Sequence, residues 1–207
     1  PDTLIDIDGG AGSAGITLDV QAGAAIASSN GDAINISADG SGVVDVDIAR
    51  SVTGTSGDGL DVTTGAAATG VDIDVLAAGT VTGDDVAIRA AHNGTGDLSI
   101  DVAGTAGDIV ATTGATATNV SVGSTGAGGT MGSITISHAG SGTATVDLDK
   151  TGAAGPIDVT TTAGTTATVT SESNVISATG NGIDVDHGGA GLASVSSNGA
   201  VTAASGT

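Results

Sequence analysis

Aspartate alternates with aliphatic residues in several short runs, and these aspartates are the side chains best suited to do chemistry. Successive side chains of a β-strand point to opposite faces, so the two acids of one run share a face. If such runs stack, their carboxylates lie about 5 Å apart and repel one another unless one is protonated or a cation lies between them. The outward positions read Thr17/Asp19, Asp45/Asp47, Asp72/Asp74, Ser99/Asp101, Ser121 and Asp147/Asp149.

Calcium is the cation that suits this pattern. Ca²⁺ takes about 6–8 oxygen ligands at roughly 2.3–2.6 Å in flexible geometry, which a column of Asp, Ser and backbone carbonyl oxygens can supply. The candidate ligands are Asp45, Asp47, Asp72, Asp74 and Asp101. The alternative is a solvated acidic face that keeps the protein soluble and prevents lateral sticking. The lack of tandem Gly-Gly-x-Gly-x-Asp repeats favours this alternative, and neither interpretation requires a cofactor.

The three histidines, His92, His138 and His187, give a weaker signal. His138 and His187 fall in one column of the repeat described below, two turns apart, with Thr161 between them. That spacing is about 10 Å, whereas the ligands of one zinc ion each lie about 2.1 Å from it. We therefore interpret the histidines as exposed turn residues. No spacing singles out a Ser/His/Asp triad either.

The acidic runs belong to a phrase of three short strands that recurs along the chain, with starts 23 to 29 residues apart. The inward pairs of the first strand are expected at Ile5/Ile7, Ile34/Ile36, Leu60/Val62, Val86/Ile88, Ile109/Ala111, Ile134/Ile136, Ile157/Val159 and Ile183/Val185. Those of the second are expected at Ile16/Leu18, Val44/Val46, Val71/Ile73, Leu98/Ile100, Val120/Val122, Val146/Leu148, Ala167/Val169 and Ala193/Val195. The shorter third strand centres on Ile26, Val52, Val81, Ala106, Met131, Ala153, Val175/Ile176 and Val201.

This repetition predicts an all-β fold, a right-handed parallel β-helix of about eight turns with three short strands per turn. We interpret residues 1–207 as one β-helix repeat domain that is part of a longer chain or of an end-to-end filament. The sequence has 37 Gly among 207 residues and no Phe, Trp or Tyr, which favours a narrow core of stacked Val, Ile, Leu and Ala. An antiparallel sandwich is the alternative, but it does not require equivalent residues to recur at this period.

The charge excludes some partners. There are 23 acidic residues against three basic ones, a formal net charge of −20. Nucleic acid and anionic membrane surfaces are poor partners for such a chain, because binding phosphate needs Lys and Arg. We expect no nucleic-acid binding and no direct membrane insertion, since no run of about 20 apolar residues is present. The lack of cysteine excludes a disulfide scaffold.

Two other functions of β-helices are less favoured. Polysaccharide lyases and hydrolases need carboxylates in a pocket, with basic residues for acidic sugars and aromatic platforms. This chain has no aromatics and only Arg50, Arg89 and Lys150 as cations, so we expect no enzymatic activity. Ice binding needs Thr-x-Thr on nearly every turn of a flat face, whereas Asp and Ser interrupt the pairs here, such as Thr143/Thr145 and Thr166/Thr168.

Phrases such as Ala78–Gly104 and Ser51–Gly65 resemble the β-helical passenger regions of bacterial autotransporters and related large surface adhesins. The resemblance covers nearly the whole chain and is one of repeat style. It implies display on the bacterial cell surface or release outside the cell, as a rod that acts as an adhesin stalk or scaffold. The implied partners are cell-surface or matrix components, or copies of the chain stacked end to end. A self-assembling filament or matrix subunit, with or without calcium, is the alternative function.

Overall fold

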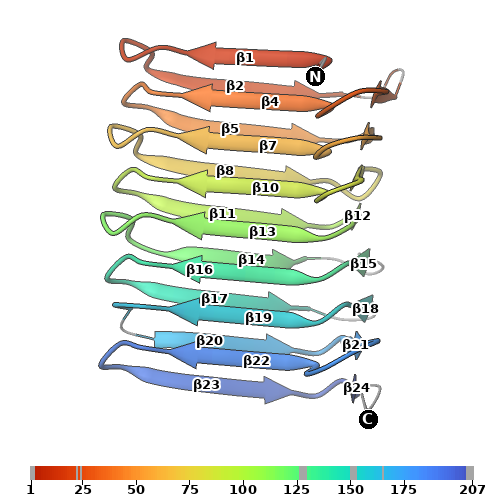
Figure 1. Cartoon of the computed structure of the whole chain (residues 1–207), viewed down its shortest axis with the longest axis vertical. Coiled ribbons are helices and arrows are strands. Elements are labelled where there is room, and N and C mark those ends of the chain that lie inside the picture. Colours follow the sequence, from red (N-terminus) through yellow and green to blue (C-terminus); the bar gives the residue numbers. More distant parts are fainter. Residues whose placement is uncertain are drawn as a thin grey trace.

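The computed structural model describes residues 3–21, 23, 25–125, 130–149, 153–164 and 166–203. These residues form 24 β-strands and no helix. The strands stack in parallel as a β-solenoid with three strands per turn (Figure 1), so the predicted parallel β-helix is confirmed. We call one turn, with one strand from each face, a rung. Rung 1 is β1–β2–β3 and rung 8 is β22–β23–β24.

Two faces of the solenoid are continuous eight-stranded sheets. The first sheet contains β1 (Ile5–Gly9), β4 (Ile34–Ala38), β7 (Leu60–Thr64), β10 (Ile88–His92), β13 (Ile109–Thr113), β16 (Ile134–His138), β19 (Ile157–Thr161) and β22 (Ile183–His187). The second contains β2 (Gly15–Val20), β5 (Val43–Ile48), β8 (Gly70–Val75), β11 (Asp97–Val102), β14 (Val120–Ser124), β17 (Thr143–Leu148), β20 (Thr166–Ser171) and β23 (Leu192–Ser197).

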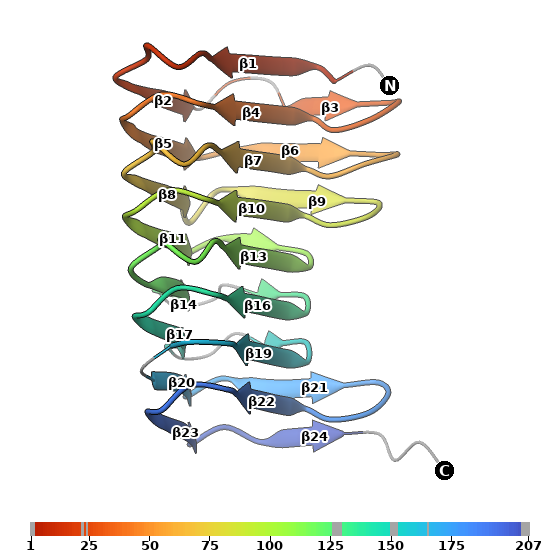
Figure 2. The same ribbon diagram turned by 60° about the vertical axis from the view of Figure 1, so that its left-hand side comes forward.

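The third face, whose strands β3, β6, β9, β21 and β24 are labelled in Figure 2, is divided by strand pairing into two sheets. Its first part contains β3 (Ile26–Ser28), β6 (Ser51–Gly54), β9 (Thr80–Gly83), β12 (Thr105–Ala106) and β15 (Thr130–Met131). Its second part contains β18 (Ala153–Ala154), β21 (Asn174–Ser177) and β24 (Val201–Ala203). The predicted third-strand centres all fall in or at these strands, and the division lies between rungs 5 and 6.

The core is a narrow column of aliphatic side chains along the solenoid axis. In the middle rungs the inward residues, such as Ile36, Ile73 and Ile136, are 0% exposed. Each stacks on its counterpart one rung away, because parallel in-register pairing places equivalent residues about 4.8 Å apart. Burial falls off at the ends: Ile5 and Ile7 are partly buried, and the inward Val195 is 53% exposed.

The register on rung 4 corrects the sequence prediction. Ile88 and Ala90 pair with Leu60 and Val62, where we expected Val86 and Ile88. The register is shifted by two residues, so the same alternate residues of the strand still point inward. The prediction was wrong because it preferred two larger aliphatic residues over a small inward alanine.

Rung 6 shows the same error on the second sheet. Ala144 and Val146 pair with Val120 and Val122, where we expected Val146 and Leu148. Again a small alanine occupies a fully buried inward position. The correction changes which outward residues become neighbours, and this matters for the acidic face.

Candidate functional site

The predicted acidic residues come together on the outer face of the second sheet. Strand register places them in two parallel columns, which we call the first and second acid columns. The first column reads Thr17, Asp45, Asp72, Ser99, Ser121 and Thr145. The second column reads Asp19, Asp47, Asp74, Asp101, Gly123 and Asp147. All five predicted calcium ligands, Asp45, Asp47, Asp72, Asp74 and Asp101, therefore lie on one surface across rungs 2 to 4.

The electrostatics of these columns oppose full ionisation. Partial burial raises the pKa of Asp72, and the neighbouring charge of Asp45 raises it further, while a hydrogen bond with Ser99 lowers it. Partial burial also raises the pKa of Asp74, and the charges of Asp72 and Asp101 add to this. At neutral pH these carboxylates repel one another, so a cation between them would relieve the repulsion.

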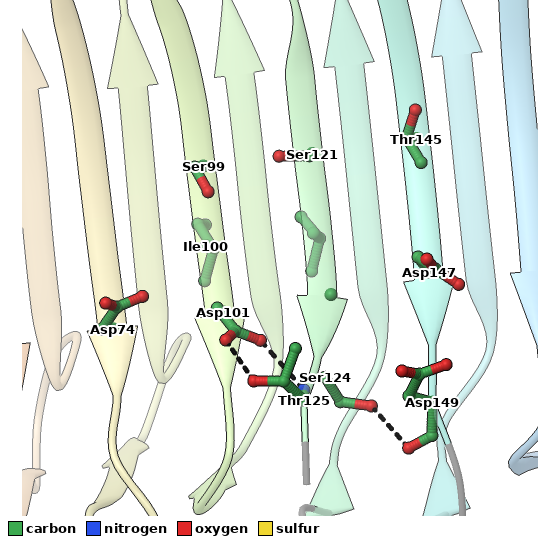
Figure 3. A pocket seen from close by; sticks show the side chains of 12 residues that line it. Asp74, Ser99, Ile100, Asp101, Ser121, Ser124, Thr125, Thr145, Asp147 and Asp149 are labelled. Atoms are coloured by element: carbon green, nitrogen blue, oxygen red, sulfur yellow. Dashed lines mark hydrogen bonds between the residues drawn. The ribbon is translucent and has the colours of Figure 1, made fainter.

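A hollow interrupts the second acid column at Gly123. Figure 3 shows Asp101 on one side of it and Asp147 on the other, and β14 contributes no acid between them. The hollow is an open cavity of about 390 Å³, and Asp149 also lines it. Asp101 accepts hydrogen bonds from the backbone N–H of Thr125 at 3.0 Å and from its hydroxyl. The corrected register on rung 6 puts Asp147, and not Asp149, level with Gly123.

No group of three or more His, Asp or Glu side chains within the described ranges converges closely enough to hold a metal ion. The acid columns are therefore an open acidic surface, and their carboxylates are spaced by the strands and not gathered around a point. Calcium binding by Asp45, Asp47, Asp72, Asp74 and Asp101 stays a prediction.

A second set of acids supports the corner before the first sheet. The Oδ1 atom of Asp32 accepts the backbone N–H of Asp58 at 2.8 Å, and Oδ1 of Asp58 accepts that of Val86 at 3.0 Å. Asp108 does the same for Ser133 at 2.7 Å. Each carboxylate thus satisfies a backbone donor of the next rung, which a buried N–H requires. These acids have a structural role.

Arg89 completes this corner. Its Nε lies 2.6 Å from Oδ2 of Asp58, which is only 6% exposed at its side chain. Asp61 lies beside Arg89 in the strand register, and burial raises its pKa, with the charges of Asp58 and Asp32 adding to the effect. Arg89 of β10 therefore supplies a positive charge beside the three acids of this corner, Asp32, Asp58 and Asp61.

Sequence reasoning missed a column of alternating threonine and histidine inside the solenoid. At the last position of each strand in the first sheet, the column reads Gly9, Ala38, Thr64, His92, Thr113, His138, Thr161 and His187. We call this the Thr–His column. His92 and His138 are 0% exposed and His187 is partly buried, so the prediction that the histidines are exposed turn residues is wrong.

Each histidine bonds to the threonine of the rung before it. The Nδ1 atoms of His92, His138 and His187 lie 2.9, 2.7 and 2.6 Å from the Oγ1 atoms of Thr64, Thr113 and Thr161, respectively. Pairing thus joins rungs 3 and 4, 5 and 6, and 7 and 8. Rungs 3 to 8 therefore alternate between a threonine rung and a histidine rung.

The turn after each histidine is built to fit the ring. All three have glycine two and four residues later, in His92-Asn-Gly94-Thr-Gly96, His138-Ala-Gly140-Ser-Gly142 and His187-Gly-Gly189-Ala-Gly191. A Cβ atom on Gly94, Gly140 or Gly189 would lie 2.7, 2.8 or 2.9 Å from Cε1 of the ring. Such contacts are too short, so the backbone approaches the imidazole only because these residues are glycines.

A Thr–His hydrogen bond is the arrangement that activates a nucleophile in some enzymes, but burial excludes that use here. Thr64 and Thr113 are 1% and 3% exposed, so no substrate reaches their hydroxyl groups. Burial lowers the pKa of both His92 and His138. The two imidazoles are therefore neutral at pH 7 and part of the core.

The outer face of the second sheet changes character toward the C-terminal rungs. Thr143 and Thr145 of β17 lie beside Thr166 and Thr168 of β20. On the next strand the equivalent positions are Leu192 and Ser194. The Thr-x-Thr pairs thus span two adjacent rungs, which is a smaller threonine array than the one expected for an ice-binding face.

The chain was compared with family models, with curated proteins and with solved structures, and none of them matches it. Within the part of the chain that the structure describes, no helix is long and apolar enough to cross a membrane.

Proposed function

We propose that this chain forms a non-enzymatic β-helical rod outside the cell, where it serves as the stalk or scaffold of a bacterial surface adhesin. The observation that carries this proposal is the stacking of eight rungs along two unbroken sheets. The first and last rungs lie about 34 Å apart at the spacing of parallel strands. Such an array has a fixed length and shape, which suits a spacer.

The surface supports the same proposal. The outer face of the second sheet carries Asp, Ser and Thr in its acid columns, and the hollow over Gly123 is lined mainly by carboxylates and hydroxyls, without a basic or aromatic side chain. A site for acidic sugars needs basic residues, and sugar stacking needs aromatic ones. Repulsion between acidic faces also opposes lateral sticking of rods.

Surface location is tested on intact producing cells. A protease that does not enter cells should release the rod, as detected with an antibody to the purified chain. Beads coated with the chain should bind extracellular matrix or host cell surfaces better than bare beads. Detection of the chain only after the cells are broken would contradict the proposal. Surface release without bead binding would support a scaffold and remove the adhesive role.

A self-assembling filament is a second candidate, and the exposed aliphatic residues of rung 8 favour it. Val195 and Val201 occupy inward positions and are 53% and 46% exposed. The strands of rung 1 present partly exposed Ile5 and Ile7, so rung 1 of a second copy would cover rung 8 and continue all three faces.

Sedimentation and electron microscopy of the purified chain test stacking. The wild-type chain should form fibres that lengthen with concentration, and Val195→Lys with Val201→Lys should shorten them because both charges would be buried at the junction. Thr145→Lys in the middle of the rod is the matched control and should leave fibre length unchanged. A wild-type chain that stays monomeric at all concentrations would remove this candidate.

Calcium is proposed as a stabiliser of the acid columns and not as a required cofactor. Two observations favour a cation there: partial burial and mutual repulsion raise the pKa of Asp72 and Asp74, and the hollow at Gly123 leaves room between Asp101 and Asp147. Because a ligand that binds only the folded state must stabilise it, the effect is measurable as a change in melting temperature.

A further inference from the structure

We propose that the Thr–His column makes the core of this rod acid-sensitive, so that the folded state loses stability when the pH falls below the ordinary range of imidazole titration. The proposal goes beyond the function as a stalk and does not depend on it. It rests on the position of three imidazoles inside the solenoid, each at a rung-to-rung contact.

The geometry favours the neutral ring. In His92 and His138, Nδ1 is engaged by a threonine hydroxyl, and no hydrogen bond of normal geometry reaches the buried Nε2. The carbonyl groups of Gly96 and Gly142 raise the pKa of His92 and His138, respectively, but less than burial lowers it. The N–H group that protonation adds to the ring would thus gain little hydrogen-bond energy. The positive charge would meanwhile be enclosed by aliphatic residues, which disfavours protonation.

Few charges face these rings from the elements packed against them. The neighbours of His92 in the column are Thr64 of β7 and Thr113 of β13, and Asp97 at the start of β11 is the one charged group that raises its pKa. The neighbours of His138 are Thr113 and Thr161, and no charged group contributes to its pKa. If His92 is protonated, the carboxylate of Asp97 offsets part of its positive charge. If His138 is protonated, no carboxylate offsets its charge.

The junction of rungs 5 and 6 is where we expect acid to act first. The Thr113–His138 bond spans this junction, and here the third face is divided, because β15 and β18 are not paired. Only the first and second sheets continue across, with a corner contact in which Gly155 donates to the carbonyls of Met131 and Gly132. A positive charge on His138 would therefore weaken the junction of rungs 5 and 6, which is the rung-to-rung contact with the fewest strand pairs.

Linkage gives the size and sign of the effect. A base whose pKa is lower in the folded state binds fewer protons folded than unfolded, so stability rises with pH. The stabilising effect is complete above the unfolded pKa of about 6.5 and is lost as pH falls toward the folded pKa. A histidine that stays neutral in the folded state down to pH 5.5 lowers the folding equilibrium constant about tenfold between high pH and pH 5.5, and two such histidines lower it about 100-fold, which is the upper limit of the effect.

The test compares the wild-type 207-residue chain with His92→Asn/His138→Asn in urea denaturation between about pH 7.5 and 5.5. Asparagine keeps an acceptor for the threonine hydroxyl and does not titrate. The folding equilibrium constant should fall more over this range in the wild type than in the double variant, by up to about 100-fold. All aspartates are the same in both chains, so their titration cancels in the comparison. Parallel loss in both chains would overturn the proposal.

A second measurement decides the case if the variant does not fold. The chain has only three histidines, so the imidazole resonances of the folded wild type can be followed separately by NMR. The signals of His92 and His138, assigned from the single Asn variants or through the sequential backbone, should stay in the neutral form below pH 6.5. Titration of both near pH 6.5 in the folded state would overturn the proposal. Hydrogen exchange at the two pH values should show the largest loss of protection in β16.

Discussion

An aspartate placed at Gly123 should weaken the folded rod, because it would complete the second acid column between Asp101 and Asp147. Asparagine at the same position is the matched control. Both side chains bring a Cβ atom that lies 3.2 Å from the carbonyl oxygen of Asp147, and both have the same shape. The difference between Gly123→Asp and Gly123→Asn therefore isolates the charge.

Strand spacing sets the size of this difference. Neighbours in the column are about 4.8 Å apart, so the new carboxylate would lie about 5 Å from each of two others. Each pair of like charges costs about 0.8 kcal/mol at the dielectric constant of water, which gives about 1.6 kcal/mol for the two. At about 0.15 M salt, a Debye length of about 8 Å reduces this to roughly half.

Urea denaturation at pH 7 measures the difference, since urea is uncharged and leaves ionic strength free to vary. Gly123→Asp should be less stable than Gly123→Asn by about 1.6 kcal/mol at low salt, and the two should converge at about 1 M salt. Equal stability at low salt, or a difference that does not respond to salt, would refute the view that the columns are mutually repelling carboxylates in register.

Of three other predictions, two concern the acid columns and one concerns the turn that closes over His138. Asp72→Asn should stabilise the chain at pH 7 by urea denaturation, because repulsion and burial raise the pKa of Asp72; the gain should vanish as pH falls below the unfolded value of about 3.9, and a gain that persists there would contradict the stated cause. Gly140→Ala should lower the melting temperature, since its Cβ would overlap the carbonyl oxygen of Ala117, whereas Gly10→Ala, with nothing within 4 Å, should not. Calcium should raise the melting temperature, and EGTA should reverse the rise; no shift would remove the calcium proposal.

The repeat could be read from the sequence because alternation and periodicity are local signals. Each inward pair such as Ile34/Ile36 has its equivalent one turn away, and period-two alternation fixes which side points inward. The same logic placed the acids of rungs 2 to 4, including Asp72 and Asp74, on one outer face, and the register confirms that placement. Whether this acidic face binds a cation depends on the ligand, and the alternation of residues along the sequence does not specify a ligand.

Register within a rung was harder to predict, because shifts by two residues leave the pattern unchanged. Ala90 and Ala144 are fully buried, yet alanine carries little hydrophobic signal and the larger neighbours were preferred. Which of the two registers a strand adopts depends on how the turns close, and the lengths of the turns vary from rung to rung. Packing across rungs, which places Ile88 on Leu60, overrides the local preference.

The histidines were misjudged although a signal was present. Ile134, Ile136 and His138 have the same parity, so alternation continued to the histidine and predicted an inward ring. The sequence prediction instead considered only whether these rings could share a metal ion, and it assigned them to exposed turns because their spacing is too wide for that. The x-Gly-x-Gly sequence after each ring was the decisive clue, since glycine there lets the backbone close over the imidazole.

The alternation of threonine and histidine also limits how such a rod can change length. Equivalent positions of the same kind, Thr64 and Thr113 or His92 and His138, are 46 to 49 residues apart. Removing the single rung that carries Thr113 would set His92 directly against His138, two rings without a hydroxyl between them. Removing two consecutive rungs would instead join His92 to Thr161 and restore the alternation. Among rungs 3 to 8, a change of length by two rungs therefore preserves the Thr–His pairing, whereas a change by one rung breaks it.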